Sequence, residues 1–70
     1  MDIWEELDAI QKEGFGVNIY WNMHITIFTP KDKWIVVQHD PKQDFQKTIY
    51  QAILQFDERT AKHSKQSNIT

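Results

Sequence analysis

Residues 16–39 read GVNIYWNMHITIFTPKDKWIVVQH and decide the fold of this chain. Three segments of this stretch are rich in β-branched and aromatic residues, which is typical of strands: residues 16–21, 25–29 and 34–39. Turn-forming residues separate the segments, first Asn22 and then the run from Pro30 to Lys33. The stretch therefore predicts a three-stranded antiparallel meander.

The strand register is predicted from which residues share a face. Residues directly opposite each other in an antiparallel pair lie on one face, so apolar residues should oppose apolar ones. A three-residue turn at 22–24 pairs Trp21 with Ile25, and a loop at 30–32 pairs Phe28 with Trp34. The same loop pairs Ile27 with Ile35. Seven residues then form the inner face: Val17, Ile19, Trp21, Ile25, Ile27, Ile35 and Val37.

A helix is predicted on each side of the meander. Residues 2–13 carry an apolar stripe, with Asp2 as the N-terminal cap and Gly14 as the C-terminal cap. Asp40 and Pro41 are expected to start the second helix, with Asp44 as a competing cap if it starts later. Its apolar stripe consists of Phe45, Ile49, Ala52, Ile53 and Phe56.

These elements predict an α+β domain of two layers, in the order α-β-β-β-α, with both helices on one face of the sheet. Residues 1–60 form this single domain. The apolar pattern stops after Arg59, so residues 61–70 are expected to form a polar, flexible tail.

Two helices on one face leave the other face of the sheet bare. The predicted register places seven residues there: Asn18, Tyr20, Thr26, Phe28, Trp34, Val36 and Gln38. Tyr20, Phe28, Trp34 and Val36 would form a contiguous apolar patch, which usually marks an interface. We therefore expect these four residues to bind a second copy of the chain or a partner protein. Two alternatives are that the tail or Trp4 covers the patch, or that the register is wrong.

Composition narrows the classes of function. The 70 residues contain eight Lys and Arg against ten Asp and Glu, a formal charge of −2 that argues against a non-specific nucleic-acid coat. There is no cysteine, no apolar run long enough to span a membrane, and no signal-peptide pattern at residues 1–3. A cytoplasmic protein with no membrane partner is expected.

The sequence offers little for catalysis. It has no cysteine nucleophile, and Ser64 and Ser67 lie in the polar tail. His39 beside Asp40 could in principle act in acid–base chemistry, but a strand end followed by a helix cap explains the pair. His24 and His39 together would supply only two metal ligands, fewer than a zinc site needs. We therefore expect no enzymatic activity, no metal and no cofactor.

Nucleic-acid binding is the alternative function. The order α-β-β-β-α is also that of double-stranded-RNA-binding domains, but their basic cluster at the start of the second helix is absent from residues 41–47. Aromatic rings on the bare sheet face could still stack single-stranded bases. Residues 1–40 carry three lysines against seven acidic residues. This charge makes Glu5, Glu6 and Asp8 a second candidate surface, one that would dock on a basic partner.

The layout resembles the small accessory proteins encoded by bacteriophages and prophages. The resemblance covers residues 2–59 and rests on the helix ending in Gly14-Phe15, the strand KWIVV at residues 33–37 and the amphipathic closing helix. Some of these proteins are homodimers, and some bind and inhibit host proteins. The resemblance thus implies a non-enzymatic binding role and a possible host partner, and it assigns no functional residue.

Overall fold

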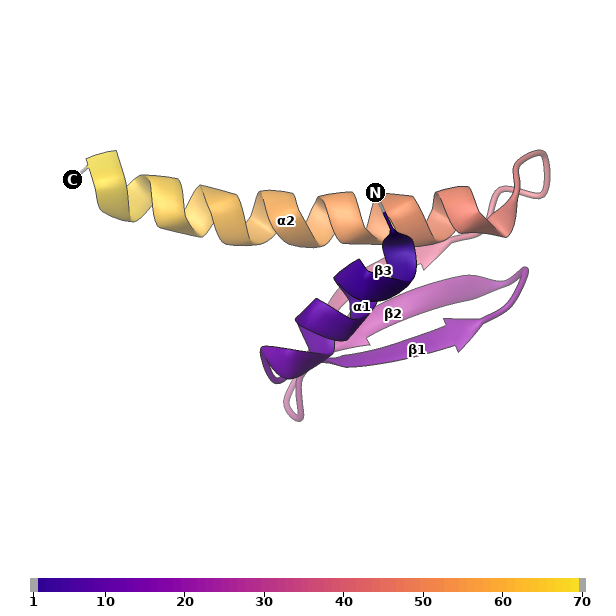
Figure 1. The fold of residues 1–70 in the computed structure, drawn as a ribbon, viewed down its shortest axis with the longest axis horizontal. Coiled ribbons are helices and arrows are strands. Elements are labelled where there is room, and N and C mark those ends of the chain that lie inside the picture. Colours follow the sequence, from indigo (N-terminus) through magenta and orange to yellow (C-terminus); the bar gives the residue numbers. More distant parts are fainter. Residues whose placement is uncertain (1, 70) are drawn as a thin grey trace.

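The computed structural model describes residues 2–69, with side chains described for residues 2–60. The elements follow in the order α1 (Ile3–Lys12), β1 (Gly16–Tyr20), β2 (His24–Phe28), β3 (Lys33–Gln38) and α2 (Phe45–Ile69). The strands form one antiparallel sheet in the order β1-β2-β3. Figure 1 shows the long α2 running across the sheet, with the short α1 beside it. The predicted α+β fold of type α-β-β-β-α is confirmed.

Local capping fixes both ends of α1. The Asp2 carboxylate accepts hydrogen bonds from the N–H groups of Trp4, at 3.0 Å, and Glu5, at 3.4 Å. At the other end Gly14 has a φ of +100°, a left-handed conformation that favours glycine. The Phe15 N–H then donates back to the Ile10 carbonyl, and the Phe15 ring packs on the core. Both predicted caps are confirmed, and Gly14-Phe15 turns the chain into β1.

The core lies between the sheet and the two helices. The apolar stripe predicted for the second helix is confirmed in full, because every one of its five residues is buried. Ten apolar side chains form the core: Leu7, Ile10, Ile25, Ile27, Ile35, Phe45, Ile49, Ala52, Ile53 and Phe56. The sheet residues in this group come from β2 and β3. The first strand, β1, packs against α1.

The first hairpin has the predicted three-residue turn, but the turn lies one position earlier than expected. Ile19 opposes Ile25, and Tyr20 opposes His24, so the turn consists of residues 21–23. Asn22 sits at its centre with a φ of 63°, which asparagine tolerates better than most residues. The predicted pairing of Trp21 with Ile25 is therefore wrong. Trp21 leaves the sheet and is 53% exposed.

The second hairpin explains why one predicted interface residue is misplaced. Ile27 opposes Ile35 as predicted, but a β-bulge follows, and Phe28 opposes Lys33 rather than Trp34. A bulge adds one residue to one strand and redirects its side chain. The expectation that Trp34 lies on the bare face is therefore wrong, because its side chain joins the helical layer.

Trp34 is held on the helical side by three contacts. Its ring meets Phe15 edge to face, with the ring centroids 4.7 Å apart, and lies 6.2 Å from Phe56. The Arg59 guanidinium lies over the ring at 4.2 Å from its centroid. Arg59 Nη1 also donates a 2.8 Å hydrogen bond to the Trp34 carbonyl. We refer to these four residues as the Trp34 cluster.

The second helix begins later than its first cap candidate indicated. Asp40 forms a turn instead, in which its carboxylate accepts from the Lys42 N–H at 2.9 Å. Asp44 directly precedes the first helical residue, Phe45, so the competing start is the observed one. The side chains of the tail predicted at residues 61–70 lie outside the described residues. The flexibility of this tail therefore stays a prediction.

The Trp34 cluster predicts a measurable difference between two aromatic residues, one on each edge strand of the sheet. We expect Trp34→Ala to lower the free energy of unfolding by about 2–4 kcal/mol, because it removes a large ring packed against the core. Tyr20→Ala should cost less than about 1 kcal/mol, because Tyr20 is half exposed. Urea unfolding of both variants checks this, and equal losses would contradict the assignment of Trp34 to the core.

Candidate interaction surfaces

The first candidate surface is the side of the sheet that faces away from the helices, called the outer face below. Its side chains are those of Asn18, Tyr20, His24, Thr26, Phe28, Lys33, Val36 and Gln38. Within residues 2–60, every buried apolar side chain lies in the helices or on the opposite side of the sheet. Tyr20 and Val36 are each 47% exposed on the outer face. This part of the chain therefore leaves the outer face open to a partner.

The outer face is hollowed rather than flat. Thr26, on the central strand, is only 7% exposed and forms the floor between larger neighbours. A hollow of about 320 Å³ lies above it, bordered by Tyr20 and His24 toward one end and by the loop 29–33 at the other. The Tyr20 and His24 rings stack, with their centroids 4.5 Å apart and a tilt of 30°. The face therefore combines a projecting aromatic pair with a hollow.

The ring of Phe28 packs closely on a glycine of the neighbouring strand. Gly16 and Phe28 are opposite each other, and a Cβ at Gly16 would come closer than 3.0 Å to three atoms of the Phe28 ring. The ring covers the glycine. This contact partly buries Phe28, although no helix packs on this side of the sheet within residues 2–60. Gly16 thus determines the orientation of Phe28 and the shape of this end of the hollow.

The four predicted interface residues do not form one patch. Tyr20, Phe28 and Val36 lie on the outer face as expected, but Trp34 lies in the Trp34 cluster on the other side. The prediction of one contiguous apolar patch is therefore wrong for Trp34, which is its largest residue. Trp4, the alternative cover for this face, belongs to α1 on the helical side and is half exposed.

The second candidate surface was predicted at the acidic residues of α1. Glu5 and Glu6 lie in the first turn of the helix, where negative charge interacts favourably with the helix dipole. Asp8 is paired with Lys12 at 3.0 Å on the same exposed face. This ion pair neutralises part of the expected charge, and a solvated helix face accounts for the rest.

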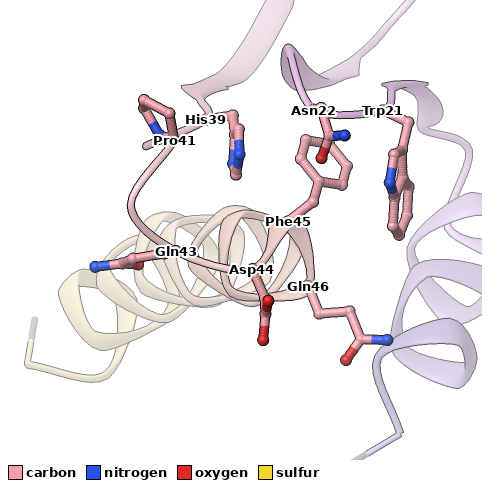
Figure 2. Close-up of a pocket in the computed structure, with 8 residues that line it drawn as sticks. All are labelled: Trp21, Asn22, His39, Pro41, Gln43, Asp44, Phe45 and Gln46. Carbon is pink, nitrogen blue, oxygen red and sulfur yellow. The ribbon is translucent and has the colours of Figure 1, made fainter.

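A further hollow, which the sequence did not indicate, lies at the start of α2. It measures about 610 Å³ and is shown in Figure 2. Three separate segments border it: the first hairpin turn, the loop that follows β3, and the first turn of α2. Its lining residues are Trp21, Asn22, His39, Pro41, Gln43, Asp44, Phe45 and Gln46. We call it the α2 hollow.

His39 has a structural partner at the edge of the α2 hollow. Its Nδ1 lies 3.1 Å from the hydroxyl oxygen of Thr48, which is buried on α2. Its ring also meets Phe45 at 5.4 Å between centroids. The Asp40 carboxylate is bonded to the Lys42 N–H instead, so the His39–Asp40 pair considered for acid–base chemistry is not formed. These contacts give His39 the role of joining β3 to α2.

The described residues contain no group of three or more His, Cys, Asp or Glu side chains placed to hold a metal ion. Among the same residues, no helix combines the length and the apolar character needed to cross a membrane. Comparisons of the chain with protein-family models, curated proteins and solved structures found no match.

The packing of Phe28 on Gly16 can be tested by adding one methyl group. We expect Gly16→Ala to displace the Phe28 ring and to lower the free energy of unfolding by about 1–2 kcal/mol, as overpacking typically does. Asn18→Ala, an exposed change on the same strand, should have little effect. Urea unfolding gives the energies, and the chemical shifts of Gly16 in the wild type report the ring above it. Stability unchanged in Gly16→Ala would contradict this contact.

Proposed function

We propose that this chain is a cytoplasmic, non-catalytic protein-interaction module that pairs with a second copy of itself through the outer face. The observation that carries the proposal is that, within residues 2–60, one whole side of the sheet has no helix packed on it. A sheet normally buries at least one face and tolerates water on the other only when that face is polar. Here the open side carries Tyr20, Phe28 and Val36.

The size of the domain favours association. A chain of 70 residues buries only about 60% of the surface that its unfolded form exposes, so its stability is marginal. Disulfides are excluded by the lack of cysteine. Burying part of a second surface would add apolar contacts that one copy cannot make. Pairing of identical chains about a two-fold axis is the most common way to obtain them.

The shape of the outer face suits a symmetric pair. A two-fold interface must be self-complementary, so one surface has to supply both a projection and a recess. The half-exposed Tyr20 ring projects from this face, and the hollow over Thr26 recedes on it. The border of the hollow carries charges of both signs, which suit the rim of an interface: Lys31, Asp32 and Lys33.

Nucleic-acid binding remains the competing function of the same surface. Lys31 and Lys33 border a hollow that also contains the Tyr20 ring, a combination found in single-strand binding sites. The positive charge at this hollow is small, because Asp32 lies between the two lysines. The whole chain also has a formal charge of −2. Protein association is therefore favoured, and the two functions differ in their dependence on salt.

The dimer can be tested with two matched variants. Sedimentation equilibrium of the wild type should show a monomer–dimer equilibrium up to about 500 µM chain. Tyr20→Glu combined with Val36→Glu should give a folded monomer, because like charges of the two copies would then face one another across the outer face. Tyr50→Lys, which changes an exposed aromatic residue on α2, should leave the association unchanged.

Three results would contradict the proposal. The first is a wild-type chain that stays monomeric over the whole concentration range. The second is equal loss of association in the Tyr50→Lys control. The third is tight binding of a labelled single-stranded oligonucleotide that weakens steeply with salt, which would favour the nucleic-acid function instead.

A further inference from the structure

The α2 hollow has the composition of a site for a cationic group. Among its eight lining residues, Asp44 is the only one that carries a formal charge, with histidine counted as neutral. Aromatic rings form the apolar part of the wall, and three side-chain amides provide carbonyl oxygens at the rim: Asn22, Gln43 and Gln46. A carboxylate, aromatic ring faces and carbonyl oxygens together favour a positive charge.

Trp21 provides the main aromatic surface. Its ring packs against Phe45, with the centroids 4.6 Å apart and the planes tilted by 52°, so the indole has a fixed support. The side chain is nevertheless 53% exposed, while Phe45 beneath it is buried. Figure 2 shows Trp21 on one side of the Phe45 ring, and Asp44 and Gln46 on the first turn of α2. An exposed tryptophan in a supported orientation is typical of binding hot spots.

Asp44 is available to a ligand. Within residues 2–60, the structure shows no hydrogen bond or ion pair to its carboxylate, whereas the carboxylates of Asp2, Asp8 and Asp40 each have a partner. Its backbone carbonyl accepts from the Lys47 N–H in the first turn of α2. The carboxylate also offsets the partial positive charge of the helix N-terminus, which would otherwise oppose a cation.

The chain already uses this chemistry once. In the Trp34 cluster, the Arg59 guanidinium lies over the Trp34 ring at 4.2 Å and donates to a carbonyl oxygen at 2.8 Å. Trp21 and Asp44 offer the same two elements, a ring face and an oxygen acceptor, without a cation from residues 2–60. An arginine fits better than a lysine, because its planar, weakly hydrated group stacks on an aromatic ring face.

We propose that the α2 hollow binds the side chain of an arginine on the surface of a partner protein. The guanidinium would stack on Trp21 with its stem beside Phe45, and the Asp44 carboxylate, which lines the same hollow, would attract its charge. This inference rests on the proposed role as a protein-interaction module, but not on the dimer, because the α2 hollow and the outer face have no lining residue in common. The formal charge of −2 would assist the approach of a basic partner.

The test uses the full chain labelled with ¹⁵N and a small probe. N-acetyl-L-arginine methylamide should shift the indole N–H signal of Trp21 saturably, with a Kd in the millimolar range expected for one side chain. The indole signals of Trp4 and Trp34 are internal controls and should not move. N-acetyl-L-citrulline methylamide has the same shape without the charge and should produce no saturable shift.

Two variants identify the carboxylate as the charge that binds. Asp44→Asn removes the charge at nearly the same side-chain size and should weaken the binding of the arginine probe about threefold or more. Asp57→Asn, an exposed change further along α2, should leave the binding unchanged. Trp21→Leu should abolish the saturable binding that the signals of Asn22 and Gln46 report.

Several results would overturn the site. These are an equal response to the citrulline probe, unchanged binding in Asp44→Asn, or a saturable response to inorganic phosphate in place of arginine. Sedimentation of the same samples separates this inference from the dimer. A monomeric chain that binds the arginine probe contradicts only the dimer, and a dimer that ignores the probe contradicts only the site.

Discussion

The position of Trp34 determines which surface of this chain is buried and which is open. The β-bulge after Ile27 moves the indole to the helical side, where Phe15, Phe56 and Arg59 surround it. Without the bulge, the alternation of β3 would place the ring opposite Phe28 on the outer face. The Trp34 cluster therefore joins the end of α1, the sheet and α2, and the outer face keeps Tyr20, Phe28 and Val36 as its apolar residues.

The two hollows follow from this arrangement. Because the helices and Trp34 share one side of the sheet, the outer face consists of strand side chains and has Thr26 at its floor. The α2 hollow arises at the first turn of α2, where Trp21 of the first hairpin turn meets Phe45, whereas Arg59 lies in the middle of the helix. One surface is suited to a second copy of the chain, and the other to a basic group of a different protein.

The local features of the fold were predictable, because each depends on a short sequence pattern. Asp2, Gly14 and the stripe from Phe45 to Phe56 act through neighbouring residues, so spacing alone indicated them. The bulge at Trp34 was not predictable in this way. It is favoured by contacts with Phe15 and Phe56, which are distant in sequence, and strict alternation gave the wrong side.

The candidate sites were predicted only in part for the same reason. Tyr20 and Val36 follow from alternation, whereas the α2 hollow combines three segments that no single pattern connects. One signal was present in the sequence. Asn22 tolerates the left-handed conformation at the centre of a turn, and placing it there would have moved Trp21 out of the sheet. Asp44 was already a candidate for the start of the helix.

The side of the sheet on which Trp34 lies can be measured directly by nuclear Overhauser contacts in the wild-type chain. If the account is right, the Trp34 indole protons give strong cross-peaks to the rings of Phe15 and Phe56. Cross-peaks from the indole to Val36 and Phe28, with none to Phe15 and Phe56, would place the ring on the outer face and contradict the account.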